Sequence, residues 1–127
     1  MPEKFCFINN QEPFEYTLSI VSGKWKLKII YLLACITPVR YGALKKNIDG
    51  ITHKMLSTQL KELEQENIIA RKEYPQVPPK VEYSLTAKGQ SLIPIVIAMC
   101  DWGKENYKPK HPHEESLEPV EKDVLTD

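Results

Sequence analysis

Residues 41–66, YGALKKNIDGITHKMLSTQLKELEQE, carry the strongest indication of how this chain folds. A short segment that ends near Asn47 is followed by Asp49-Gly50, a dipeptide typical of tight turns. Thr52 then stands where its hydroxyl can cap a second segment, from about His53 to Glu66. Apolar side chains recur in that segment at helical spacing, at Leu56, Leu60 and Leu63. Two helices joined by a tight turn that contains glycine predict a helix-turn-helix.

The other face of the second helix is polar and basic. It carries His53, Lys54, Ser57, Thr58 and Lys61. Such a face is often only a solvated helix surface, but here it begins directly after the turn of the motif. Side chains of these types reach base edges and phosphates from a helix that lies in the major groove. We therefore predict that these five residues bind DNA.

The hydrophobic period changes from 3.6 to 2 after this helix, which predicts strands at about Ile68–Tyr74 and Val81–Leu85. Three prolines stiffen the connection at residues 75–80. Basic residues lie on and beside this hairpin, at Arg71, Lys72 and Lys80. They could protect an exposed strand edge from aggregation, or contact phosphates or the minor groove. The position after the polar helix favours a DNA-binding wing.

Further helices flank the motif. Pro13 suits a first helical position, and Gly23 indicates the end of that helix. A second helix is expected at about Lys24–Cys35, ended by Pro38. Thr86 caps a single long final helix that runs to about Tyr107.

The final helix carries an apolar stripe, at Leu92, Val96, Met99 and Trp102. The stripe could be intramolecular core, but a small winged helix has few elements to cover it. A second copy of the chain is the expected cover, with Phe14 of the first helix taking part. The predicted fold is mainly α with a small β-hairpin (α+β), a winged helix-turn-helix that dimerises through its N- and C-terminal helices.

The length of 127 residues fits one domain with appendages. We expect a flexible arm at residues 1–11, the folded domain at 12–107 and an acidic, disordered tail at 108–127. No apolar run is long enough to span a bilayer, and the first residues carry no secretion signal. The expected location is the cytoplasm.

The charge is unevenly distributed along the chain. The formal net charge is zero, yet residues 24–80 hold eleven Lys or Arg against five Asp or Glu. Residues 109–127 hold two lysines against six acids. A phosphate backbone would meet the basic central segment rather than the neutral average.

Three widely spaced cysteines predict no disulfide framework. Cys35 and Cys100 are expected to be packed as small hydrophobic residues, whereas Cys6, close to Lys4, is a candidate thiol sensor. Enzymatic functions are disfavoured, because the only histidine in the expected domain is His53 and no glycine-rich phosphate loop is present. Neither a cofactor nor a metal site is expected.

Several segments together resemble the HxlR family of bacterial transcriptional regulators. They are Ser22-Gly23-Lys24-Trp25, Arg40-Tyr41, Ile51-Thr52-His53-Lys54-Met55-Leu56, Leu60-Lys61-Glu62-Leu63-Glu64, and Val77-Pro78-Pro79-Lys80-Val81-Glu82-Tyr83-Ser84-Leu85-Thr86 with Gly89. The resemblance implies a homodimeric winged helix, operator DNA as the partner and regulation of a nearby operon. It also favours a DNA contact by Arg40. One position departs from the family, because Glu12 stands where many members have a sensing cysteine before the proline.

Two functional hypotheses remain at this point. The first is a transcriptional regulator that binds a near-palindromic operator as a homodimer, with a small molecule or an electrophile as its effector. The second is a winged-helix module for protein–protein interaction without affinity for DNA. The basic segment and the polar helix face favour the first.

Overall fold

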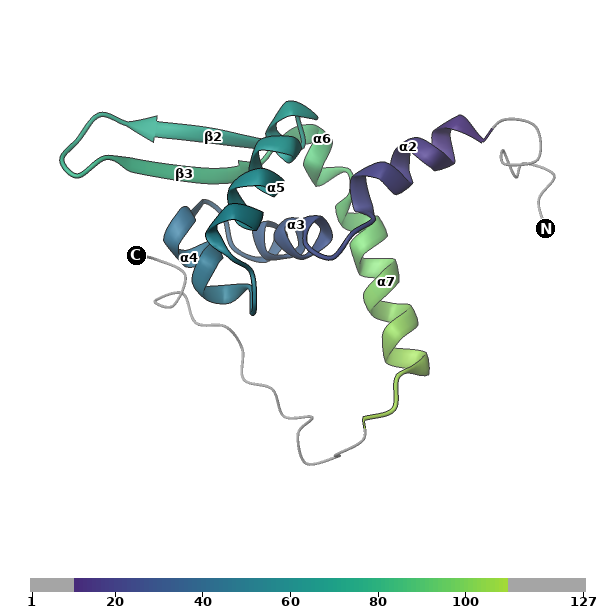
Figure 1. The fold of residues 1–127 in the computed structure, drawn as a ribbon. Helices are drawn as coiled ribbons and strands as arrows, with labels where there is room; N and C mark the ends of the chain where they lie inside the picture. The colour runs from purple at the N-terminus through teal and green to yellow at the C-terminus, as the bar shows by residue number, and fades with distance from the viewer. Residues whose placement is uncertain (1–10, 110–127) are drawn as a thin grey trace.

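A computed structural model describes residues 11–109 of the chain, and most of the expected arm and tail, together with Cys6, lie outside them. The elements in chain order are α2 (Glu12–Val21), α3 (Lys26–Cys35), β1 (Val39–Arg40), α4 (Tyr41–Asn47), α5 (His53–Gln65), β2 (Ile69–Tyr74), β3 (Lys80–Leu85), α6 (Ala87–Gln90) and α7 (Ile93–Asn106). This is the predicted winged helix-turn-helix, with α4 and α5 as its two motif helices and β2–β3 as the wing (Figure 1).

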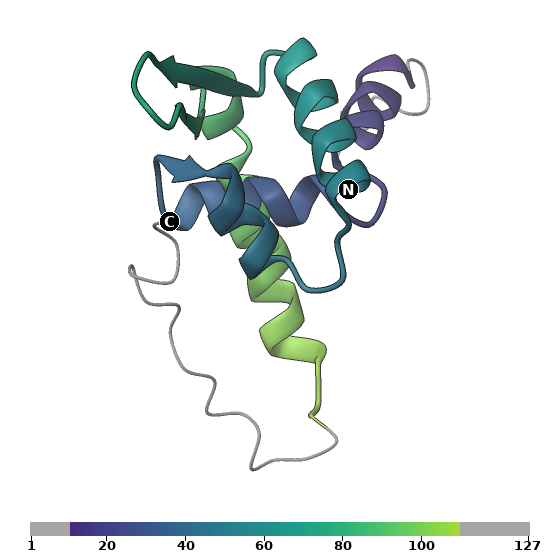
Figure 2. The same cartoon turned by 60° about the vertical axis from the view of Figure 1, so that its left-hand side comes forward.

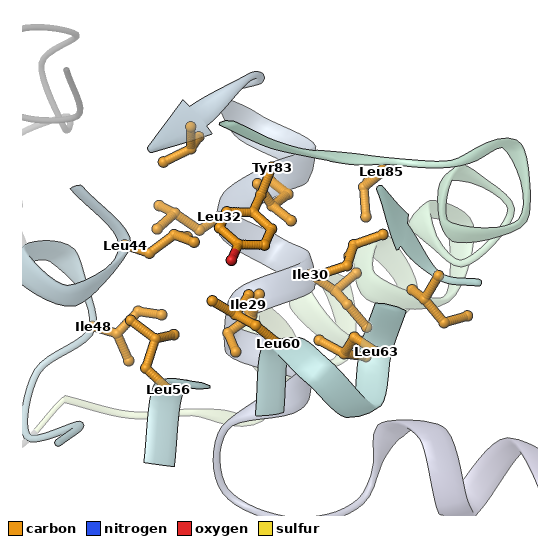
Figure 3. Close-up of a cluster of buried hydrophobic side chains, with 14 of the residues drawn as sticks. Ile29, Ile30, Leu32, Leu44, Ile48, Leu56, Leu60, Leu63, Tyr83 and Leu85 are labelled. Carbon is orange, nitrogen blue, oxygen red and sulfur yellow. The ribbon is translucent and has the colours of Figure 1, made fainter. Parts of the chain in front are cut away.

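The core is built around α3. Ile29 and Ile30 lie between Leu60 and Leu63 of α5 on one side and the sheet, represented by Tyr83, on the other (Figure 3). The leucine stripe of α5 is buried as expected, with each side chain no more than 2% exposed. Burying such a side chain contributes about 1.5–3 kcal/mol, so this stripe fixes how α5 sits on the body.

The ends of α5 are set by local chemistry. The Thr52 hydroxyl accepts a hydrogen bond from the Met55 amide at 3.1 Å, which confirms the predicted cap. Gly50, in the turn before it, has a φ of +84°, a conformation that favours glycine. Beyond α5, Asn67 adopts a φ of +62° and turns the chain into β2.

The sheet has three antiparallel strands in the order β1-β3-β2. The sequence predicted only the hairpin, because β1 is two residues long and is too short to show an alternating pattern. β1 pairs Arg40 with Glu82 of β3, and β2 pairs Lys72 with the same Glu82 from the other side. The hairpin of β2 and β3 projects from the body in Figures 1 and 2.

The prediction of one long final helix is wrong, because the chain forms α6 and then, after a break at Ser91-Leu92, α7. Pro94 explains the break: it has no amide hydrogen, and in a continuous helix its ring would clash with the carbonyl of Gln90. Thr86 caps α6 instead, by accepting a hydrogen bond from the Gly89 amide at 3.0 Å.

Helices α2 and α7 extend away from the compact body (Figures 1 and 2). Each of these two helices buries a single residue in the described chain, Ile20 in α2 and Val96 in α7. Among residues 11–109, no helix combines the length and apolar character that crossing a membrane requires.

Candidate nucleic-acid interface

The polar face of α5 is fully formed. All five residues predicted to bind DNA are exposed, His53, Lys54, Ser57, Thr58 and Lys61. Lys54, Thr58 and Lys61 lie opposite the buried leucine stripe, and His53 and Ser57 lie beside it, so the packing of α5 leaves all five on the outside. Because Thr52 holds the first turn in place, the side chains at the start of α5 project from a fixed backbone.

Tyr41, the first residue of α4, ties the two motif helices together. Its hydroxyl lies 3.1 Å from Nδ1 of His53, 3.2 Å from the His53 carbonyl oxygen and 3.2 Å from Oγ of Ser57. The Tyr41 and His53 rings are stacked, with centroids 5.8 Å apart and an interplanar angle of 5°. Sequence patterns alone assigned no role to Tyr41, although it opens the motif directly after Arg40.

The opposite side of α5 is held by an ion pair. Lys26 Nζ of α3 lies 2.9 Å from Oε1 of Glu62, and the lysine side chain is only 19% exposed. This lysine is therefore engaged in holding α3 against α5. Its positive charge is neutralised, in contrast to Lys54 and Lys61 on the outer face.

The outer face of the sheet collects a second group of cations. Alternation along the strands puts Lys72, Tyr74, Lys80 and Glu82 on one face, and the register puts Arg40 in the same row as Glu82. The ammonium groups of Lys72 and Lys80 lie 5.0 and 4.6 Å from the centre of the Tyr74 ring. Glu82 accepts a hydrogen bond from the Tyr74 hydroxyl at 3.0 Å and lies 3.5 Å from Lys80 Nζ.

This face thus carries three cations and one carboxylate, which is paired with Lys80. We call Arg40, Lys72, Tyr74, Lys80 and Glu82 the outer sheet face. The sequence had placed Arg40 apart from the wing lysines, and β1 is what brings it beside them. The surplus positive charge suits contact with phosphates.

Arg71 points to the other face of the hairpin. It stands opposite Tyr83, and a hydrogen bond to the Tyr83 hydroxyl, with attraction from Glu73, raises the pKa of Arg71. Its Nη1 lies 3.5 Å from Oε1 of Glu73. The three basic wing residues predicted from the sequence therefore lie on two faces of the hairpin, since the two-residue period of a strand separates Arg71 from Lys72 and Lys80.

An apolar surface remains on α2 and α7. Large side chains are substantially exposed there: Phe14 54%, Leu18 42%, Ile97 53%, Met99 52% and Trp102 71%. Val96 departs from the predicted interface set, because it is 6% exposed and packs into the core of its own chain. Leu92 is also partly buried against that core.

The two described cysteines are exposed in the single chain, so the expectation that Cys35 is buried as a small hydrophobic residue is wrong, while the expected packing of Cys100 on the dimer helix stays a prediction. Cys35 ends α3 one turn beyond Tyr31, on the side of the helix away from the buried isoleucines. Cys100 lines a shallow apolar groove of about 280 Å³ between α3 and α7, with Leu27, Tyr31 and Met99. Charge interactions with Cys35 and then Cys100 are the main causes that raise the pKa of Tyr31.

Comparison with known proteins agrees with this architecture. Residues 20–111 match the family described as HxlR-like helix-turn-helix. An uncharacterised HTH-type transcriptional regulator of Halalkalibacterium halodurans is 60% identical over 94 residues, which cover 74% of this chain and 83% of that protein.

Solved structures are similar as well. The redox regulator HypR in its oxidised form is 43% identical, with a TM-score of 0.71 over 76% of this chain and 99% of HypR. A MarR-family transcriptional regulator of Porphyromonas gingivalis is 40% identical, with a TM-score of 0.70 over 84% of this chain and 97% of that one.

The family match spans both motif helices, the wing and all of α7, but it leaves out most of α2. Several of the most similar curated proteins are named as HTH-type transcriptional regulators. The chain therefore belongs to the HxlR-like helix-turn-helix family and is a DNA-binding transcriptional regulator.

Proposed function

We propose that the chain binds a near-palindromic operator as a homodimer, with α5 in the major groove. His53, Lys54, Ser57, Thr58 and Lys61 are the residues that face the bases and the flanking phosphates. The observation that carries the proposal is their common exposure on one face of a helix whose opposite face is buried. A helix held in this way can present its N-terminal side chains to base edges.

The outer sheet face is the second contact in this proposal. Arg40 immediately precedes α4, so this face lies next to the motif, and its lysines extend along the wing. We assign Arg40, Lys72 and Lys80 to phosphate or minor-groove contacts. Arg71 is assigned a separate contact from the opposite side of the wing, because its guanidinium lies beside Tyr83 and Glu73.

A second copy of the chain is the proposed cover for α2 and α7. Phe14, Met99 and Trp102 leave more than half of their surface exposed, which is unusual for aromatic and large apolar residues in an isolated domain. Leu92 would lie at the edge of this interface, whereas Val96 supports it from within its own chain. Two-fold symmetry then places two copies of α5 on one side of a duplex, which requires a near-palindromic site.

Binding by α5 is tested with DNA selected from a random pool by the full-length protein. We expect the Lys54→Ala/Lys61→Ala variant to stay folded and dimeric but to lose affinity for the selected DNA in a gel-shift titration. Glu64→Ala/Gln65→Ala, on exposed positions near the end of the same helix, is the matched control. Unchanged binding by the lysine variant would remove α5 from the interface, and no enrichment of any DNA would favour a protein–protein interaction module.

An electrophile is the effector class that the two exposed thiols favour. Cys100 lines the apolar groove between α3 and α7 together with Tyr31, and Cys35 ends α3 one turn beyond Tyr31. Modification there would disturb the proposed interface. We expect mass spectrometry after diamide treatment to find modified cysteine together with altered DNA binding, and an equal response from a cysteine-free variant would exclude thiol sensing.

The proposed location is the cytoplasm, because the operator DNA that this function requires lies there.

A further inference from the structure

The Tyr41 hydroxyl has three polar neighbours but only one hydrogen to donate. The His53 carbonyl oxygen, at 3.2 Å, can only accept, so a hydrogen bond at this contact requires the Tyr41 hydrogen. The other two neighbours must then donate to the phenolic oxygen: the Ser57 hydroxyl at 3.2 Å and Nδ1 of His53 at 3.1 Å. This is the arrangement that satisfies all three contacts at once.

The arrangement determines which ring nitrogen of His53 carries the hydrogen. With Nδ1 protonated and donating to Tyr41, a neutral imidazole has a bare Nε2, which is a hydrogen-bond acceptor. The stacked Tyr41 ring, only 5° from parallel, holds the imidazole plane. His53 is exposed at the first position of α5, so its Nε2 is available to a ligand on the DNA-facing surface.

We infer that Tyr41 is a positioning residue that fixes His53 as a hydrogen-bond acceptor, and that His53 thereby selects a base with an exposed amino group. This inference rests on the proposed placement of α5 in the major groove. The amino groups there are N4 of cytosine and N6 of adenine, whereas guanine and thymine offer acceptors at the corresponding positions. A histidine held in the opposite tautomer would donate from Nε2 and would prefer guanine or thymine at that position.

The surroundings of His53 support this division of roles. The charged side chains that line the hollow beside it are Lys45, Lys46 and Asp49. Lysine side chains only donate hydrogen bonds and suit phosphates, whereas phosphates repel the Asp49 carboxylate. Reading an amino group at the start of α5 therefore falls to Nε2 of His53.

The tautomer is tested directly by long-range ¹H–¹⁵N NMR of the imidazoles in the full-length protein, with His53→Gln used to assign the signals. We expect His53 to show a protonated Nδ1 and a bare Nε2. In Tyr41→Phe, which keeps the ring but removes the hydroxyl, this preference should disappear. Tyr16→Phe is the matched control, because it also removes a single tyrosine hydroxyl, one bonded to Glu66 at 3.2 Å. A protonated Nε2 in the wild type would overturn the inference.

The consequence for DNA is tested by selecting sites from a random pool with the same variants. The wild type and Tyr16→Phe should enrich cytosine or adenine at one position of each half-site, and Tyr41→Phe should lose that preference while keeping the others. Affinity of Tyr41→Phe for the wild-type site should fall by about tenfold, within the range of one base contact.

Adding Tyr41→Phe to a His53→Gln variant should cause no further change in base preference, because the tyrosine acts through the histidine. If the wild type enriches specific sites and Tyr41→Phe enriches the same sites with the same base preferences, the inference about Tyr41 is overturned and the proposed function still stands. If the wild type enriches no sequence, both the proposed function and the base preference assigned to His53 are overturned. The NMR spectrum then still shows, independently of DNA, whether Tyr41 sets the His53 tautomer.

Discussion

Replacing Trp102 with alanine should dissociate the proposed dimer. Trp102 is 71% exposed in the described chain, and a tryptophan buries on the order of 200 Å² when fully covered. About 140 Å² of it is therefore available to a partner. At about 25 cal/mol per Å², covering that surface contributes at most about 3.5 kcal/mol for each protomer, and only part of this appears as affinity. The substitution removes this contribution from both symmetric protomers, so the dimer dissociation constant should rise by at least about 100-fold.

Sedimentation equilibrium over a concentration series measures this constant for both proteins. Val77→Ala is the control, because Val77 is 98% exposed at the tip of the wing, far along the chain from α7. Its dissociation constant should match the wild type. Equally tight dimerisation of Trp102→Ala and the control would refute this reasoning, since the exposed surface of α7 would then face solvent in the dimer as well.

Two further substitutions test the framework that holds the interface. Gly89→Ala should lower the free energy of unfolding by about 1–3 kcal/mol, measured by thermal or urea denaturation, because the added Cβ would overlap the carbonyl oxygen of Ile68. Unchanged stability would show that α6 can move away from Ile68. Thr52→Ala should lower the free energy of unfolding by about 1 kcal/mol, because it removes the acceptor of the hydrogen bond from the Met55 amide. Thr52→Ser, which keeps the hydroxyl, should be close to wild type, and equal destabilisation in both variants would contradict the cap.

The helices and the hairpin could be predicted because their signals are local. The leucines of α5 recur on one helical face, Thr52 offers a cap, and the change of period after Ile68 marks the strands. In each case the pattern along the chain and the packing in the fold agree. The broken final helix carried a local signal too, in Pro94, but the continuous apolar stripe around it masked the interruption.

The parts of the surface that could not be predicted depend on contacts between distant segments. Nothing near Tyr41 in the sequence shows that its hydroxyl meets His53, twelve positions later. The grouping of Arg40 with the wing lysines follows from the pairing of β1 with β3, and β1 is too short to leave a pattern. Cys35 stands on an apolar helix, and its exposure is decided by which side of α3 faces the core.

The proposed function requires α5 and the outer sheet face to contact the phosphate backbone of the operator. A titration of operator affinity against salt concentration tests this requirement most directly. The logarithm of the binding constant should fall linearly with the logarithm of the salt concentration. Lys72→Ala/Lys80→Ala should reduce the slope by about 0.9 for each lysine that neutralises a phosphate in the wild-type complex. A wild-type affinity that stays constant across the titration would contradict the proposed contacts with the phosphate backbone.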